Sequence, residues 1–143
     1  DNQGDCKVES TMDFTWKKSL GLMGWKIEDD GLGVVFDKII PNFILDNLPK
    51  VIQSFYPKKN TGLILHPGGR KIIDAYKKIF ENNKSIQISE QILSEYGNVS
   101  SVSVLLVLER AIKNKLFGDY IMAALGPGFT VGLSKIVIQN ANR

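Results

Sequence analysis

Two residues have the type and the surroundings that suit catalysis: His66, the only histidine among the 143 residues, and Asn98. A histidine and an asparagine side by side can both donate hydrogen bonds to a thioester carbonyl oxygen that becomes an enolate. Oxyanion stabilisation of this kind is often the largest single contribution to catalysis. The pair would therefore suit decarboxylation of a malonyl thioester, and the histidine could also stabilise a cysteine thiolate as an ion pair.

His66 lies where a short apolar run, residues 63–65, meets Pro67-Gly68-Gly69. The run is typical of a buried strand, and the ligand crevices of open α/β sheets lie beyond the carboxyl ends of strands. The two glycines allow a ligand to approach the backbone closely, and the free N–H groups of the helix expected from Pro67 favour an anion. The alternative, a core or surface histidine that only caps a turn, stays open at this point.

Asn98 lies in a segment, residues 96–101, that is typical of a tight loop before another helix. Taken alone, it is best explained as a turn asparagine that tolerates unusual backbone angles or caps the next helix. A catalytic role requires that His66 and Asn98 converge. The intervening segment is long enough for a helix to cross the sheet and for the chain to return.

The composition indicates one domain with a hydrophobic core. Hydrophobic residues make up 43% and charged residues 23% of the chain, and the net charge is only +3. The lysines are scattered in pairs, whereas nucleic-acid binding requires a dense basic stripe with stacking aromatics, so we expect no nucleic-acid partner. No stretch approaches the ~20 apolar residues of a membrane span, so we expect no membrane partner.

The single cysteine, Cys6, excludes an intrachain disulfide, and nothing indicates an oxidising compartment. No signal peptide is visible, and we expect a cytoplasmic protein. Because the chain begins with Asp1 rather than methionine, we expect an excised or processed piece of a longer parent. The polar start predicts a loose N-terminal lead-in over residues 1–20, followed by a folded domain over residues 21–143.

The pattern along the chain predicts an α/β fold with one mixed sheet packed with helices. A hairpin is expected over residues 24–36, because Asp30-Gly31 is a strong turn signal. The other elements follow from apolar periodicity and from Pro and Gly punctuation: helices over 41–55, 67–80, 89–95 and 100–112, and strands over 63–65, 120–125 and 129–138.

Three motifs resemble the C-terminal half of type III polyketide synthases, the chalcone and stilbene synthase family. His66-Pro67-Gly68-Gly69 is similar to the family's HPGG. Residues 94–101, SEYGNVSS, resemble its SEYGNMSS, and residues 126–131, GPGFTV, resemble its GPGLTV. The segment over residues 30–41 also resembles the one ahead of the family's VPG. The motifs occur in the family's order and at similar spacing, and the resemblance covers about residues 24–138.

The resemblance implies the C-terminal half of a thiolase-like fold with His66 and Asn98 as the catalytic pair. It implies that Gly68 and Gly69 line the coenzyme A tunnel. It also implies a pocket for the growing polyketide, with four residues that shape it: Leu32, Val34, Ser100 and Pro127. Val34 stands where the plant enzymes carry a bulky phenylalanine, which predicts a roomier pocket or a different starter.

In this family the nucleophilic cysteine belongs to an N-terminal thiolase-like half that this sequence lacks, and Cys6 lies too close to His66 in the sequence to replace it. The parent would be an acyltransferase, usually a homodimer, that condenses an acyl-CoA starter with malonyl-CoA by decarboxylative Claisen condensation. Its substrates are coenzyme A thioesters, and no metal or other cofactor is implied. The chain by itself is expected to be inactive.

Three alternatives stay open. The chain could be a non-catalytic stand-alone domain, or a subunit that pairs with a separate cysteine-bearing partner. It could belong to a β-ketoacyl synthase of the fatty-acid-initiating type, although the residues that follow the histidine and the asparagine fit the polyketide family better. The last alternative is an unrelated small α/β binding module.

Overall fold

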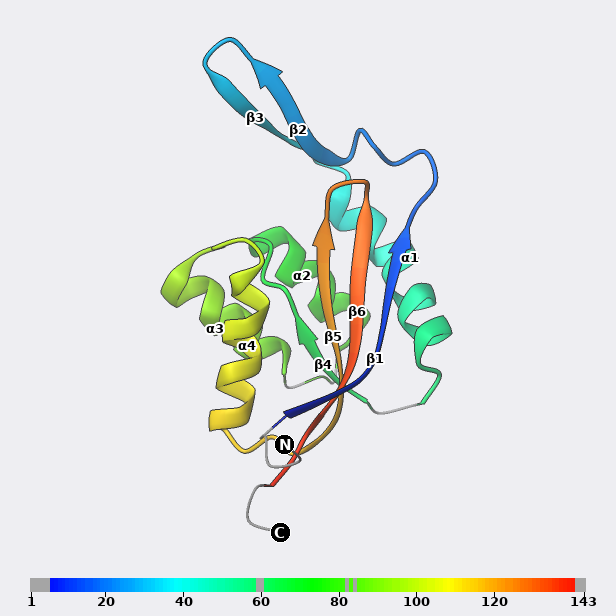
Figure 1. Ribbon diagram of the computed structural model, residues 1–143, viewed down its shortest axis with the longest axis vertical. Coiled ribbons are helices and arrows are strands. Elements are labelled where there is room, and N and C mark those ends of the chain that lie inside the picture. The colour runs from blue at the N-terminus through cyan, green and yellow to red at the C-terminus, as the bar shows by residue number, and fades with distance from the viewer. Residues whose placement is uncertain (1–5, 59–60, 82, 84, 141–143) are drawn as a thin grey trace.

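A four-stranded sheet forms the centre of the molecule in the computed structural model, which describes residues 6–58, 61–81, 83 and 85–140. The strand order is β1-β6-β5-β4 (Figure 1). The parallel pair joins β4 to β5, and the pairs β5–β6 and β1–β6 are antiparallel. The strands are β1 (Cys6–Thr15), β4 (Gly62–Leu65), β5 (Gly118–Gly126) and β6 (Thr130–Ile138).

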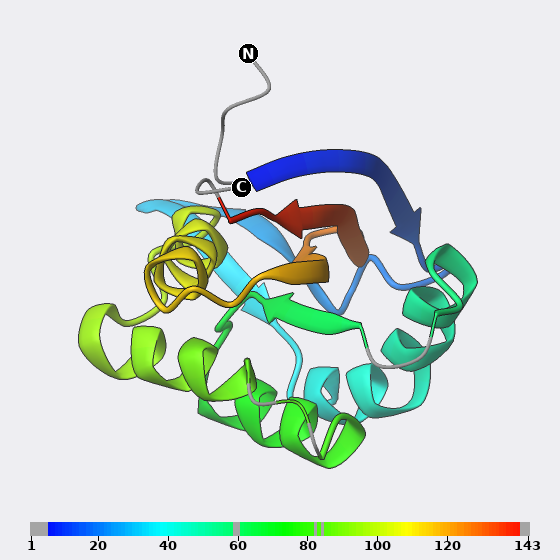
Figure 2. The same cartoon turned by 90° about the horizontal axis from the view of Figure 1, so that it is seen from below.

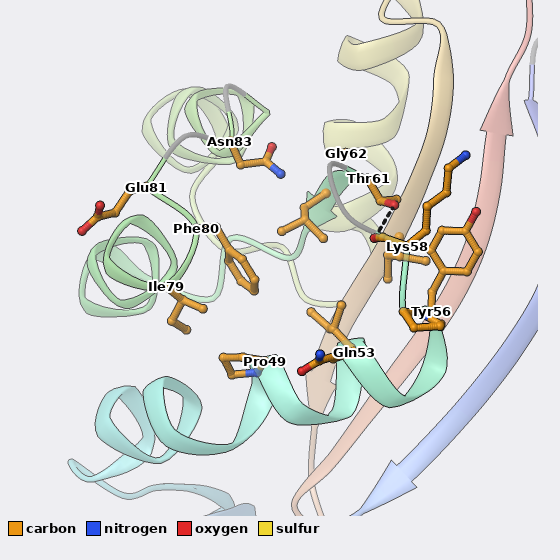
Figure 3. A pocket seen from close by; sticks show the side chains of 14 residues that line it. Pro49, Gln53, Tyr56, Lys58, Thr61, Gly62, Ile79, Phe80, Glu81 and Asn83 are labelled. Atoms are coloured by element: carbon orange, nitrogen blue, oxygen red, sulfur yellow. Dashed lines mark hydrogen bonds between the residues drawn. The ribbon is translucent and has the colours of Figure 1, made fainter.

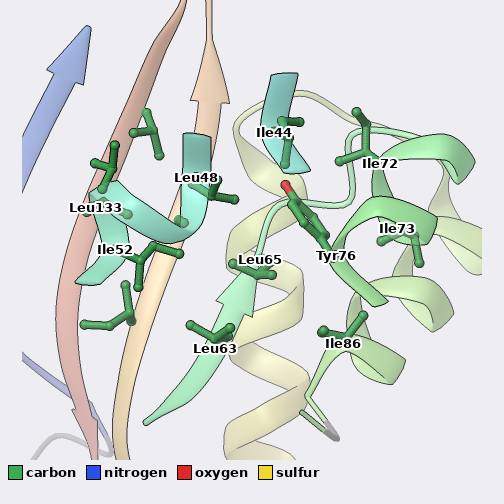
Figure 4. Close-up of a cluster of buried hydrophobic side chains, with 14 of the residues drawn as sticks. Ile44, Leu48, Ile52, Leu63, Leu65, Ile72, Ile73, Tyr76, Ile86 and Leu133 are labelled. Carbon is green, nitrogen blue, oxygen red and sulfur yellow. The ribbon is translucent and has the colours of Figure 1, made fainter. Parts of the chain in front are cut away.

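Helices cover both faces of this sheet, because successive side chains of a strand point to opposite sides. On β4, Leu63 and Leu65 join one core cluster while Ile64 joins the other. Helices α1 (Ile40–Phe55) and α2 (Arg70–Ile79) contribute to the first cluster, in which Tyr76 is the largest fully buried side chain (Figure 4). Helices α3 (Ile86–Tyr96) and α4 (Val102–Lys113) form most of the second. Figure 2 shows α1 in cyan and α4 in yellow on opposite sides of the sheet.

A separate hairpin, β2 (Met23–Glu28) and β3 (Gly31–Phe36), extends away from the body of the molecule (Figure 1). Its register places Trp25 opposite Val34 and Ile27 opposite Leu32. Facing residues in an antiparallel pair lie on the same side, so one face of the hairpin is apolar. This apolar face is largely exposed: the exposed fractions are 63% for Trp25 and 86% for Ile27.

The predicted α/β fold with a mixed sheet is confirmed, and three element boundaries need correction. Helix α2 begins at Arg70 rather than at Pro67, because Gly69 adopts φ +151°, which no helix contains. Helix α3 begins at Ile86 rather than at residue 89. It ends as predicted at Gly97, whose positive φ of +71° suits a glycine cap.

The third correction concerns the predicted loose lead-in over residues 1–20. Cys6–Thr15 form the edge strand β1, which pairs with β6 from Cys6 opposite Ile138 to Thr15 opposite Thr130. Most side chains of β1 are exposed, so backbone pairing stabilises the strand and the sequence carries no apolar pattern that could indicate it. Residues 1–5 lie outside the described residues, as do parts of the predicted loop at 57–62 and of the predicted helix end at 81–84.

Within the described part of the chain, no helix is both long and apolar enough to cross a bilayer.

Candidate active site

His66 directly follows β4 and is only 8% exposed. Its backbone N–H donates to the carbonyl oxygen of Ala123 on β5 over 2.9 Å, so the sheet pairing continues to the histidine itself. Burial lowers the pKa of His66, because an apolar surrounding disfavours the charged imidazolium. The ring is therefore neutral at neutral pH, and its Nδ1 has no hydrogen-bond partner among the described residues.

The two glycines after Pro67 lead from the strand into α2. The carbonyl oxygen of His66 accepts hydrogen bonds from the N–H of Gly68 at 2.9 Å and from the hydroxyl of Tyr76 at 3.3 Å. Gly68 lies beside the Cδ2–Nε2 edge of the imidazole, since a Cβ at this position would be 3.8 Å from Nε2. Gly69 adopts φ +151° with ψ 168°, a conformation that is essentially restricted to glycine.

Asn98 directly follows Gly97, the C-terminal cap of α3. Its side-chain Nδ2 donates to the carbonyl oxygen of Gly68 at 3.1 Å, and its Oδ1 accepts a hydrogen bond from the backbone N–H of Ser100 at 3.0 Å. Both ends of the carboxamide are therefore held. One Nδ2 hydrogen remains for another acceptor.

The structure brings the two candidate residues together. His66, Gly68 and Asn98 line one small cavity of about 30 Å³. The other lining residues are apolar: Met23, Phe36, Ile40, Ile72, Leu125 and Phe129. Hydrogen bonds inside an apolar cavity are stronger than in water, so two donors here suit stabilisation of an oxyanion. In the part of the chain that the structure describes, no group of His, Cys, Asp and Glu side chains could hold a metal ion.

The family description "Chalcone and stilbene synthases, C-terminal domain" matches residues 8–139, which is nearly the whole chain. The chain belongs to this family. It is 32% identical to the phloroglucinol synthase of Pseudomonas fluorescens over 143 aligned residues, which cover 94% of this chain and 41% of that protein.

Solved structures of type III polyketide synthases have the same fold. The match to PKS-I of the brown alga Ectocarpus siliculosus has a TM-score of 0.82 at 19% identity and covers 94% of this chain and 40% of that one. The match to the C-terminal type III polyketide synthase domain of Steely1, a type I/III hybrid from Dictyostelium, has a TM-score of 0.81 at 20% identity. It covers 93% of this chain and 40% of that one. The chain thus spans about 40% of the length of these relatives.

For this chalcone and stilbene synthase C-terminal domain, the structure places the other predicted site residues outside the cavity. Leu32 and Val34 lie on the exposed face of the hairpin, with exposed fractions of 66% and 64%. Ser100 and Pro127 are also exposed, and Gly69 does not line the cavity. Their predicted roles in a polyketide pocket and in a coenzyme A tunnel stay predictions.

Cys6 lies at the start of edge strand β1 and is outside the cavity as well. It is partly buried, which raises the pKa of its thiol. Its packing against the cluster around α3 and α4 separates it from the apolar residues around His66. The cysteine therefore has neither the position nor the ionisation of a nucleophile for this site.

A larger cavity of about 630 Å³ lies near the other end of β4, where Gly62 and Leu63 contribute to it (Figure 3). Pro49 and Gln53 line it from α1, and Ile79 and Phe80 from the end of α2. Among the described residues that line this cavity there is no histidine, no cysteine and no pair of carboxylates. We therefore assign the candidate active site by its chemistry, to the smaller cavity at His66 and Asn98.

The apolar residues of the His66 cavity were not predicted as site residues from the sequence. Phe36, Leu125 and Phe129 come from three different segments, and their types indicate only burial. Tyr76 is a further example, because the hydrogen bond from its hydroxyl to the carbonyl oxygen of His66 depends on how α2 packs in the core that it shares with β4. The Gly-Pro-Gly turn between Leu125 and Phe129 was the one sequence feature that could have indicated these two residues as part of the site.

Proposed function

We propose that this chain is the part of a type III polyketide synthase that supplies the His66–Asn98 pair for decarboxylative condensation. The observation that carries the proposal is that both side chains line one apolar cavity although they come from different elements. Family membership supports the same conclusion. The proposed substrates are an acyl-CoA starter and malonyl-CoA, and the proposed assembly of the parent is a homodimer.

In the proposed reaction the malonyl thioester binds with its carbonyl oxygen between the two donors. The neutral His66 imidazole donates through Nε2, and Asn98 donates through the free Nδ2 hydrogen. Loss of carbon dioxide leaves its bonding electron pair on the α-carbon, and the resulting enolate oxygen is stabilised by both hydrogen bonds. The enolate carbon then attacks an acyl group held as a thioester, forming a carbon–carbon bond and releasing the thiolate.

The acyl thioester requires a cysteine from outside this chain, because Cys6 is remote from the cavity. The exposed apolar face of the hairpin supports this view of an incomplete site. Leu32 and Val34 would form a wall of the polyketide pocket once another part of the parent covers them. We therefore propose that the isolated chain neither loads a starter nor condenses it.

The test compares the full-length parent with the 143-residue chain in the presence of an acyl-CoA starter and malonyl-CoA. Mass spectrometry of the products and carbon dioxide release are measured for each. We expect condensed product from the full-length protein and none from the chain alone. Condensation by the chain alone would contradict the need for a separate cysteine.

A second candidate function is a subunit that pairs with a separate cysteine-bearing partner. The exposed apolar side chains of α4, Val102 at 51% and Leu105 at 53%, favour a protein partner, as does the exposed apolar face of the hairpin. Under this alternative, mixing the chain with a cysteine-bearing N-terminal half restores condensation without a covalent link. A chain that is active only within one continuous polypeptide would exclude the subunit role.

A further inference from the structure

Two fully buried serines hold the peptide groups next to the two candidate catalytic residues. Ser89 on α3 and Ser103 on α4 are both 0% exposed. The Ser89 hydroxyl donates to the carbonyl oxygen of Leu65, the residue before His66, over 2.7 Å. The Ser103 hydroxyl accepts a hydrogen bond from the N–H of Val99, the residue after Asn98, over 2.9 Å.

The first contact fixes the peptide plane that leads into His66. The carbonyl of Leu65 and the N–H of His66 belong to one planar peptide unit. Its N–H is held by Ala123 on one side and its carbonyl by Ser89 on the other. In the described part of the chain β4 is an edge strand, so no further strand pairs with this carbonyl, and a helix side chain takes that place.

The second contact acts in the same way on the loop of Asn98. The carbonyl of Asn98 and the N–H of Val99 form one peptide unit, which Ser103 holds from the start of α4. The N–H of Ser103 donates in turn to the carbonyl oxygen of Ser100 at 3.1 Å. These two hydrogen bonds fix the loop against the start of α4, and the side chain of Asn98 extends from this fixed loop to the carbonyl oxygen of Gly68.

The two serines are coupled, because α3 and α4 pack together as one unit. Ile92, Val104 and Val107 share a core cluster between these helices. Arg110 on α4 donates to both carboxylate oxygens of Glu95 on α3, at 3.1 and 2.7 Å. A shift of either serine therefore changes the spacing of His66 and Asn98 as well as the stability of the fold.

We infer that Ser89 and Ser103 are positioning residues that set the distance and direction between His66 and Asn98. The inference rests on the proposed function, because it gives these serines their role in decarboxylation. Small misplacements of catalytic groups are costly, and a shift of about 1 Å can lower a rate by about 10²-fold.

The test uses the full-length protein with Ser89→Ala and Ser103→Ala, well below their unfolding temperatures. We expect kcat for malonyl-CoA decarboxylation to fall about 10- to 100-fold with little change in KM. Ser89→Thr and Ser103→Thr keep the hydroxyl, so each should lose less kcat than the alanine variant at the same position, although threonine adds a methyl group to a buried site.

Ser85→Ala is the matched control. Ser85 is also buried, and its hydroxyl bonds to the backbone of Leu63 on the same strand, farther from His66. We expect this variant to lose stability but to keep kcat within about twofold of wild type. Equal losses of kcat in Ser85→Ala, Ser89→Ala and Ser103→Ala would overturn the inference, since a general loss of stability would then explain them.

Crystal structures of the same full-length variants separate the inference from the proposed function. We expect Ser89→Ala to turn the His66 ring and Ser103→Ala to break the bond from Asn98 Nδ2 to the carbonyl of Gly68. If both variants keep the wild-type His66 orientation and this 3.1 Å bond, the positioning role is wrong. If the wild-type protein does not decarboxylate malonyl-CoA, the proposed function fails, and the structures still decide whether the serines orient the pair.

Discussion

The side-chain Nδ2 of Asn98 lies 3.1 Å from the carbonyl oxygen of Gly68, and this hydrogen bond joins the asparagine loop to the backbone that follows His66. The Ser100 N–H holds the other end of the same carboxamide. Asn98 is therefore oriented before any ligand binds. Preorganised donors of this kind contribute to catalysis without reorganising during the reaction.

Asn98→Asp is expected to lower strongly the rate at which the full-length protein decarboxylates malonyl-CoA. A carboxylate would replace the Nδ2 donor and would repel both the Gly68 carbonyl oxygen and an enolate. The loss of one oxyanion donor costs about 10²–10³ in kcat, measured as carbon dioxide release from malonyl-CoA. Asn114→Asp, at an exposed asparagine after α4, is the control and should keep the wild-type rate. An Asn98→Asp protein with normal turnover would exclude Asn98 as a donor.

His66 should make the stability of the chain depend on pH below neutrality. Because burial lowers the pKa of His66, the unfolded chain binds a proton on this ring at a higher pH than the folded chain does. Full stability is present above the unfolded pKa of about 6.5. Stability then falls as the pH decreases from there to the lowered pKa of the folded state.

Urea unfolding between pH 7.5 and pH 5 measures this effect, with His66→Gln as the comparison. His66 is the only histidine, so the variant should show a flatter profile in this range. Hydrogen bonds and ion pairs with basic side chains lower the pKa values of three carboxyl groups, those of Glu90, Glu95 and Asp119. These groups therefore take up protons at more acidic pH, and they do so in both proteins. Parallel profiles for the two proteins above pH 5 would show that His66 is not desolvated in the folded chain.

Ser100 is expected to tolerate glycine better than a β-branched residue. Its φ of +60° lies in the left-handed region, which costs an ordinary residue about 1 kcal/mol. Ser100→Gly removes this cost and keeps the N–H that holds Asn98, so the urea midpoint should stay the same or rise. Ser100→Val should lower the free energy of unfolding by about 1–2 kcal/mol. A Ser100→Val chain as stable as wild type would show that this backbone conformation is not maintained in solution.

The apolar face of the hairpin should make the isolated chain associate or bind an apolar dye. Ile27 is 86% exposed and faces Leu32 across the strands. Ile27→Lys should reduce dye fluorescence and the mass measured by light scattering, with little effect on the unfolding midpoint, because the side chain has few contacts to lose. Val8→Lys also replaces an exposed apolar side chain with lysine, but on β1, and should have no effect on dye binding or mass. A monomeric wild-type chain that binds no dye would contradict this prediction.

The sequence was sufficient to predict the fold class and the two segments that converge on the cavity. Both segments carry local sequence signals: the apolar run before His66 indicates a buried strand, and the glycine after Tyr96 indicates the C-terminal cap of a helix. Strand β1 was predicted only as part of a loose lead-in, because its side chains are mostly exposed and its pairing depends on backbone atoms. Ser89 and Ser103 were missed for a related reason, since their partners are backbone groups that no residue type identifies. Leu32 and Val34 were assigned by resemblance, and both are exposed on a hairpin that extends away from the body of the molecule (Figure 1).

The measurement that tests the central claim most directly is malonyl-CoA decarboxylation by the full-length protein with His66→Ala. The variant removes the buried imidazole from the cavity that it shares with Asn98. We predict that carbon dioxide release falls at least about 10²-fold while circular dichroism shows an unchanged fold. Decarboxylation at a rate near that of wild type would contradict the account, because the site would then function without His66.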